Sequence, residues 1–336
     1  LRLHFCRWTE SDTAWMARPT LEACLADFEP DSLHTGEPVY VGVDLSATQD
    51  ITAVAFVVPT GFVDLPREDG ETARLPTFDA WVEAWTPRDT LHERSLRDNA
   101  PYDIWADEGW LNAIPGRMVR FDFVAARLAE ASAIFDVQSV AYDRYGFKRA
   151  FEPELDALGL TLPIVEHPQG GKKKGAESGL WMPGSKAALE AALLDRRIRL
   201  RRSPVLVSAM MSAVTEEDPF GNAWFSKRRA AGRIDALVAL AMALGAAATM
   251  PAPARSIYEH PGAFAEAEDD TGQPERRPVM AWEAEDDDDG PNGVGGRRGQ
   301  AVVAVVGDER QPGLRQGVER RAVAAAGGQV RLAAAQ

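Results

Sequence analysis

The sequence predicts an α/β protein built on a mixed β-sheet that is covered by helices. Two β-branched runs, 39–45 and 51–58, are separated by a short polar turn, which is typical of two adjacent buried strands. A third strand is expected at 78–86. From about residue 121 onward, helical and strand patterns alternate. Hairpin-like strands followed by such an alternation indicate a mixed sheet rather than a helical bundle or a barrel.

The remaining elements follow from hydrophobic spacing and from Pro and Gly positions. Helices are expected at 88–99, 102–111, 121–135, 146–158, 186–194, 204–214 and 234–247. Further short strands are expected at 137–142, 162–165 and 198–200. The folded domain is therefore expected to extend over 39–250.

The two ends of the chain differ from this domain. Residues 1–38 have the pattern of a connector, and because the chain begins without Met, we expect them to follow a missing upstream part. Residues 251–336 combine Pro-rich pieces, the acidic run 283–289 and Gly- and Arg-rich spacers. Such a composition buries too little apolar surface to fold alone, so this tail is expected to be disordered.

Composition excludes several classes of protein. The only cysteines, Cys6 and Cys24, have no nearby Cys or His partners, which argues against a disulfide framework and a zinc site. No apolar run approaches the length of a membrane span, and the first ten residues are unlike a signal peptide. A soluble intracellular protein without a membrane partner is the expectation.

The net charge of −14 conceals a basic region. Residues 1–159 contain 14 basic and 28 acidic side chains, whereas residues 160–234 contain 13 basic and 7 acidic ones. Solvated loops and DNA contact explain this region equally well. The candidate DNA contacts are Lys172, Lys173, Lys174, Arg197, Arg199, Arg201, Lys227 and Arg228.

Two aspartates follow apolar strands. Asp44 ends the strand VYVGVD, and Asp143 ends SVAYD. Capping of the following turn is the simpler explanation for each residue alone. If the two strands are parallel neighbours, however, their carboxyl ends meet at one edge of the sheet, where open α/β sheets form their sites.

A third aspartate, Asp235, begins a helix that is apolar on nearly all sides and is therefore expected to be buried. An ionised carboxylate there needs a partner, which is either a base such as Arg233 or a bound metal. Stabilisation by the helix dipole is the alternative explanation.

Together, Asp44, Asp143 and Asp235 suit hydrolysis of a phosphodiester. That reaction needs a nucleophilic water and relief of charge on the leaving oxygen, which two divalent ions held by carboxylates supply. Mg²⁺ and Mn²⁺ prefer such oxygen ligands. Asp50, at the far end of the turn after Asp44, is a fourth candidate that could bind a metal directly or through water. Closing the hairpin is an equally good explanation for it.

The sequence also resembles a known protein family. The segments GVDLSATQDITAV, VAYDRYGF and GRIDALVALAMALG, together with WTPRDTLHERSLRDNAPYDIWADEGWL, resemble the nuclease domain of tailed-phage terminase large subunits, and the resemblance runs from about Arg2 to about Ala248. It implies a ribonuclease-H-like fold, with helices on both faces of the sheet, and metal-dependent cutting of double-stranded DNA. Asp44, Asp143 and Asp235 would be the metal-holding catalytic acids, and Asp50 the accessory acid.

The resemblance also implies partners. They are the portal, the small terminase subunit and an ATPase motor domain, at work in the cytoplasm of a bacterial host. The sequence departs from the whole terminase large subunit in one respect, because it contains no GxxxxGK[ST] phosphate loop, the motif expected of an ATPase motor. The segment GLWMPGSK at 179–186 inverts the Lys and Ser order and follows no apolar strand. The ATPase motor is therefore expected to be absent, and residues 1–38 to be the connector from it.

Three other hypotheses compete with the terminase nuclease. Actin-like sugar kinases also begin with a strand that ends in Asp, but their turn supplies a Gly for phosphate, whereas Ser46, Ala47 and Thr48 stand here. Other ribonuclease-H-like nucleases, such as resolvases and transposases, are closer alternatives. In a non-catalytic DNA-binding packaging module, the acids would only cap turns and the basic region would bind DNA.

Overall fold

The computed structural model describes all residues except 1–14, 47–49, 68–69, 144–146, 172–177 and 250–336. The strands are β1 (Leu25–Ala26), β2 (Pro38–Asp44), β3 (Thr52–Pro66), β4 (Thr72–Pro87), β5 (Asn112–Ile114), β6 (Asp136–Tyr142), β7 (Ile164–Glu166), β8 (Ile198–Arg201), β9 (Thr215–Glu217) and β10 (Ala223–Phe225). The helices are α2 (Arg18–Glu22), α3 (Pro30–Leu33), α4 (Leu91–Asp98), α5 (Tyr102–Asp107), α6 (Phe121–Ile134), the π-helical segment η1 (Phe147–Phe151), α7 (Glu152–Ala157), α8 (Met182–Leu194), α9 (Pro204–Ser212) and α10 (Asp235–Ala248). The expected tail at 251–336 lies outside the described residues.

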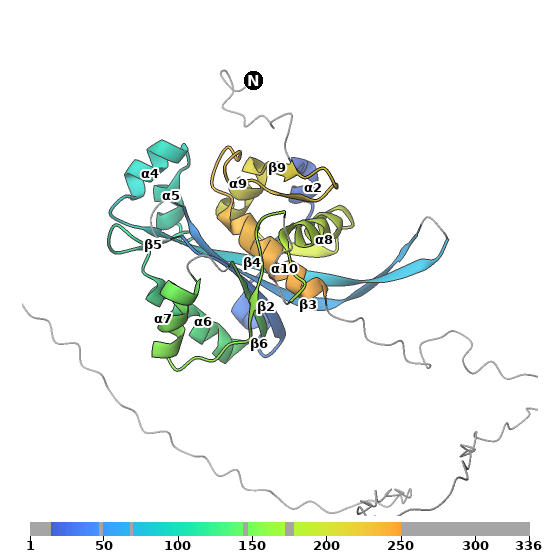
Figure 1. Ribbon diagram of the computed structural model, residues 1–336, viewed down its shortest axis with the longest axis horizontal. Helices are drawn as coiled ribbons and strands as arrows, with labels where there is room; N and C mark the ends of the chain where they lie inside the picture. Colours follow the sequence, from blue (N-terminus) through green and yellow to red (C-terminus); the bar gives the residue numbers. More distant parts are fainter. Residues whose placement is uncertain (1–14, 47–49, 68–69, 144–146, 172–177, 250–336) are drawn as a thin grey trace, which may run out of the picture. The chain divides into compact units, whose positions relative to one another are not determined.

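Strands β1 to β8 form one mixed sheet in the spatial order β1-β8-β4-β3-β2-β6-β7, with β5 beside β4. Strands β2, β3 and β4 are antiparallel neighbours. Strand β6 runs parallel to β2, and β8 runs parallel to β4. Figure 1 shows β3 and β4 continuing together as a two-stranded ribbon beyond the other strands. The expected mixed sheet is confirmed, and so is the parallel pairing on which the strand-end argument depended.

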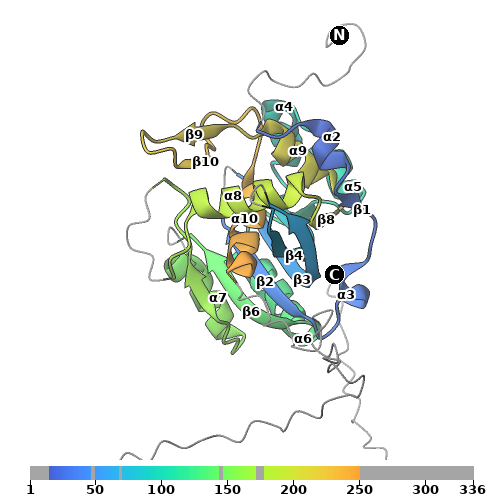
Figure 2. The ribbon, with the colours of Figure 1, turned by 90° about the vertical axis from the view of Figure 1, so that its right-hand side faces the viewer.

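Helices cover both faces of this sheet. Helices α8, α9 and α10 lie on one face, and α6 and α7 lie on the other (Figures 1 and 2). The two-residue period of a strand explains how β2 serves both layers. Val39, Val41 and Val43 belong to the core on the α6 side, whereas Gly42 faces α10.

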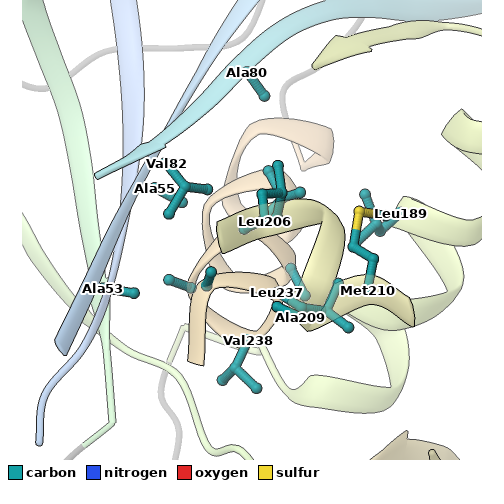
Figure 3. Packing of buried hydrophobic residues seen from close by; sticks show 14 of the residues in the cluster. Ala53, Ala55, Ala80, Val82, Leu189, Leu206, Ala209, Met210, Leu237 and Val238 are labelled. Carbon is teal, nitrogen blue, oxygen red and sulfur yellow. The ribbon is translucent and has the colours of Figure 1, made fainter. Parts of the chain in front are cut away.

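Helix α10 is the centre of the core on its face of the sheet. Every residue from Asp235 to Ala247 is buried, which confirms the expectation of a buried helix. Figure 3 shows Ala53 and Ala55 of β3 directed toward α10, with α8 and α9 packed on its other side. Although α10 is apolar, it has only 14 residues, and none of the described helices is both long and apolar enough to cross a bilayer.

The backbone of α10 lies directly on β2. A Cβ atom added to Gly42 would lie 2.1 Å from the Ala239 carbonyl oxygen and 2.7 Å from the Ala243 backbone nitrogen. Both distances are far below van der Waals contact, so only glycine fits at this crossing. The absent side chain brings the start of the helix close to the end of the strand.

The ordered core begins further upstream than the expected boundary at residue 39. Helix α2, strand β1 and helix α3 lie within 15–38, Leu21 and Cys24 are buried, and β1 pairs in parallel with β8. Elements of two to five residues are too short to show a periodic pattern of their own, and β1 is completed by a strand that comes far later in the chain.

Two other elements differ from the sequence-based expectation. The helix expected at 146–158 is divided into η1 and α7, and Pro153 at the start of α7 lacks the amide hydrogen that a continuous helix needs. The hairpin of β9 and β10 was not expected, because strands of three residues give little periodic signal.

Replacing Gly42 with Ala tests the contact between α10 and β2. We expect Gly42→Ala to lower the free energy of unfolding by about 1–3 kcal/mol or more, since the added methyl group overlaps the helix backbone. Urea denaturation measures this loss. Gly170→Ala is the matched control, because its Cβ would meet open space. Equal stability of the two variants would contradict the account.

Candidate active site

Asp44 and Asp143 lie side by side at one edge of the sheet. Asp44 is the last residue of β2, and Asp143 directly follows β6. The parallel register pairs Val43 with Tyr142, so the two aspartates occupy the next position of adjacent strands. Asp44 is buried and Asp143 is half-buried. The carboxyl ends of two parallel strands therefore place two acids together, as the strand-end argument predicted.

Asp235 reaches the same edge from the helix layer. It is the first residue of α10 and is 2% exposed. Its Oδ2 atom accepts a hydrogen bond of 3.4 Å from the backbone amide of Ile51, which directly precedes β3. A carboxylate at a helix N-terminus is favoured by the helix dipole, which offsets part of the cost of burial.

Lys227 joins two of these acids. Its Nζ atom lies 2.6 Å from Asp44 Oδ2 and 2.9 Å from Asp235 Oδ1. Lys227 comes from the segment between β10 and α10. The other oxygen of Asp44, Oδ1, accepts a hydrogen bond of 3.0 Å from the Gln169 side-chain amide. Two carboxylates from different layers of the fold therefore converge on one cation.

Burial and charge shift the protonation of these groups in a coupled way. Burial, together with the negative charges of Asp44 and Asp50, raises the pKa of Asp235 to about 6, although Lys227 acts in the opposite direction. For Lys227, burial lowers the pKa, but the charges of Asp44 and Asp235 outweigh burial and raise it above its ordinary value. Lys227 is therefore charged at neutral pH.

Asp50 belongs to a neighbouring ion-pair network. Its carboxylate pairs with the guanidinium of Arg233, whose Nε lies 3.0 Å from Asp98 Oδ2. Arg94 donates a hydrogen bond of 2.8 Å to the backbone carbonyl of Asp50. Burial tends to raise the pKa of Asp98, but hydrogen bonds from Arg97 and Arg233 lower it well below its usual range. This network holds Asp50 in place two residues before β3.

The expected four-acid metal site is only partly assembled in this structure. Within the described residues, no group of three or more His, Cys, Asp or Glu side chains is arranged to hold a metal ion. Asp50 is paired with Arg233, while Asp44 and Asp235 share Lys227. The donor chemistry fits a cation all the same, because two buried carboxylates each direct an oxygen toward one point less than 3 Å away.

The sequence of this chain matches one family of known proteins. The family model described as terminase large subunit, endonuclease domain, matches residues 1–250. The chain belongs to this family. The resemblance seen in the four sequence segments is therefore confirmed, and the sheet is mixed, as expected with it.

The large terminase of phage HK97 is similar to this chain in both sequence and structure. The terminase large subunit of Enterobacteria phage HK97 is 40% identical over 215 residues, which make up 64% of this chain and 38% of that protein. The crystal structure of the HK97 large terminase matches with a TM-score of 0.58 at 36% identity, covering 69% of this chain and 43% of that one. This chain therefore spans less than half the length of the HK97 protein.

A solved structure with lower sequence identity contains bound magnesium. The crystal structure of the large terminase nuclease from thermophilic phage G20c with bound magnesium is 14% identical, with a TM-score of 0.40, and covers 70% of this chain and 97% of that one.

The candidate DNA contacts are scattered. Arg199 and Arg201 lie on β8, three strands away from β2, and Arg197 directly precedes β8. Each of the three pairs with an acid, namely Asp195 for Arg197, Asp79 for Arg199 and Glu29 for Arg201. Arg197 is buried. Arg228 is 82% exposed and lies 3.4 Å from Glu216. Residues Lys172 to Lys174 lie outside the described residues. Among the candidates that the structure describes, Lys227 is the one that contacts Asp44 and Asp235. DNA contact by the whole set stays a prediction.

One residue at the site, Gln169, and one pairing, that of Lys227 with Asp44, were not predicted from the sequence. Gln169 lies three residues beyond the end of β7, which is parallel to β6, so it follows the same strand-end rule as Asp44 and Asp143. That rule could have identified it. The pairing of Lys227 with Asp44 joins positions 183 residues apart, for which the local sequence gives no signal.

His167 fixes the end of β6 beside the site. Its backbone amide donates a hydrogen bond of 2.7 Å to the Tyr142 carbonyl, and its Nε2 lies 2.7 Å from Ser185 Oγ. The ring is fully buried. Burial lowers the pKa of His167 to about 4, so the ring is neutral in the folded protein at neutral pH.

This burial predicts a pH-dependent loss of stability. Between about pH 6.5 and pH 4 the unfolded chain binds a proton at His167 that the folded chain does not, so stability falls as pH falls. From pH 7 to pH 5 the parent should lose about 2 kcal/mol more than His167→Gln, measured by urea denaturation. The opposite contribution of Asp235 is present in both proteins and cancels in this difference. Equal losses would show that His167 is not held neutral.

Proposed function

We propose that this chain is a metal-dependent endodeoxyribonuclease that cuts double-stranded viral DNA during genome packaging. The observation that carries the proposal is the convergence of Asp44 Oδ2 and Asp235 Oδ1 on one cation. Membership of the terminase large subunit endonuclease family supports it. The 40% identity to the HK97 terminase large subunit, over 38% of that protein, supports it as well.

Asp44 and Asp235 would hold the metal, and Asp143, beside Asp44 on the next strand, would contribute a third carboxylate. Carboxylate oxygens suit Mg²⁺ and Mn²⁺, and two such ions are proposed. Bound divalent ions would supply a nucleophilic water at neutral pH and stabilise charge on the departing oxygen. Gln169 fixes Asp44 through a hydrogen bond to Oδ1, and the Ile51 amide does the same for Asp235 through Oδ2.

Asp50 has a supporting part in this proposal. Its pairing with Arg233 and the bond from Arg94 to its carbonyl hold Asp50 directly before Ile51. The amide of Ile51 in turn orients Asp235. Asp50 therefore acts as an accessory acid whose negative charge adds to the field at the site.

The substrate and partners belong to the proposal as well. The exposed Arg228, near the site in the segment after β10, and the basic run 172–174 are proposed to contact the DNA backbone. The portal, the small terminase subunit and an ATPase motor domain are the proposed partners, in the cytoplasm of the bacterial host.

A plasmid-cutting assay tests the proposed activity. The chain is incubated with supercoiled plasmid and Mn²⁺ or Mg²⁺, with Asp44→Asn and Asp235→Asn alongside. Loss of either metal-holding carboxylate should reduce the cutting rate by more than about 100-fold, and EDTA should abolish cutting by the parent.

The control is Asp27→Asn, which removes an exposed carboxylate that pairs with Arg202 next to β1. It should cut at the parent rate. Circular dichroism checks that each variant is folded. Cutting by folded Asp44→Asn at the parent rate would overturn the assignment of the site.

A further inference from the structure

The ammonium group of Lys227 stands where the proposed metal would bind. Its Nζ atom contacts one oxygen of Asp44 and one oxygen of Asp235, at 2.6 Å and 2.9 Å. We infer that Lys227 is a built-in counter-ion of the site, whose side chain competes with a divalent cation for these two oxygens and leaves them when the metal binds. This inference rests on the proposed function, since it requires a metal at Asp44 and Asp235.

The four carboxylate oxygens of Asp44 and Asp235 differ in their partners, since two accept hydrogen bonds from neutral donors and two contact Lys227. Asp44 Oδ1 accepts a hydrogen bond from Gln169, and Asp235 Oδ2 accepts one from the amide of Ile51. Both of these donors are neutral. The two remaining oxygens, Asp44 Oδ2 and Asp235 Oδ1, both face Lys227. A metal bonded to both of them at about 2.0–2.1 Å would need the space of the ammonium, so the two cations exclude each other.

Burial explains why a counter-ion is needed before the metal arrives. Asp44 is 4% exposed and Asp235 is 2% exposed. Two ionised carboxylates this deeply buried repel each other, and a cation between them offsets this repulsion and the cost of burying the charges. Arg233 is already shared between two other carboxylates. The compact ammonium of Lys227, on its flexible four-carbon chain, supplies the positive charge and can withdraw again.

The backbone around Lys227 is anchored independently of the site. The Ser226 amide donates a hydrogen bond of 2.9 Å to the Val214 carbonyl, and its hydroxyl donates one of 2.8 Å to Glu216. Arg229 Nε lies 3.0 Å from the same Glu216. Residues on both sides of Lys227 are therefore fixed to the β9–β10 hairpin. Exchange of the two cations needs only rotation of the Lys227 side chain, with no movement of the hairpin.

Direct metal binding tests the competition without measuring DNA cutting. Mn²⁺ is titrated into the full chain and into Lys227→Met by isothermal titration calorimetry. Lys227→Met should bind Mn²⁺ at least about tenfold more tightly than the parent, because the competing charge is gone. Mn²⁺ should also raise the melting temperature of Lys227→Met more than that of the parent, since it neutralises carboxylates that have lost their partner.

Three further variants make the test specific. Lys186→Met removes a lysine that pairs with Glu190 on α8 and should bind Mn²⁺ as the parent does. Asp235→Asn should weaken Mn²⁺ binding, which locates it at the site. Lys227→Gln also removes the charge but keeps a polar side chain. If Lys227→Met does not fold, Lys227→Gln takes its place and should likewise bind Mn²⁺ more tightly than the parent.

Two outcomes contradict the inference in different ways. If the parent binds Mn²⁺ through Asp235 and both Lys227 variants bind it equally or more weakly, Lys227 does not compete with the metal, and the proposed function stands without it. If neither the parent nor any folded variant binds Mn²⁺ at millimolar concentration, the proposed metal dependence falls together with the inference.

Discussion

The direct contact between the backbones of α10 and β2 is the constraint on which the site depends. Glycine at position 42 lets the helix lie on the strand without an intervening side chain. That approach brings Asp235, at the start of the helix, to the edge where Asp44 ends the strand. A larger residue at position 42 would move the helix away and separate two acids that now share one cation. Packing in the core thus determines geometry at the site.

The elements and acids that could be predicted from sequence are those whose signal is local. The buried strands and α10 show their hydrophobic periods within a few residues. Asp44 and Asp143 were identified because each directly follows an apolar strand, and the parallel pairing of β2 with β6 brought them together. Asp235 was noticeable as a charge on an apolar helix, and its burial is confirmed. The short elements within 15–38 lacked such a signal, since β1 exists only by pairing with β8.

What could not be predicted are the partners of these acids, since they come from distant parts of the chain. The sequence offered Arg233 as a base for Asp235, but in the folded chain Arg233 pairs with Asp50 and Asp98, and Lys227 takes that role. Asp50 was grouped with the metal ligands because it is close to Asp44 in sequence. Closeness in sequence does not reveal that the guanidinium of Arg233 pairs with Asp50 in the folded chain. Likewise, the arginines of β8 form a basic cluster in the sequence, whereas the fold pairs them with acids.

The central claim is that Asp44 and Asp235 form a cation site whose resident ammonium gives way to a metal. Crystals of the chain soaked in Mn²⁺, with data collected at the manganese absorption edge, test it most directly. The expected result is an anomalous peak for an ion that contacts both carboxylates, with Lys227 Nζ withdrawn from them. Absence of a peak between the two acids, with Lys227 Nζ still paired to both, would contradict it.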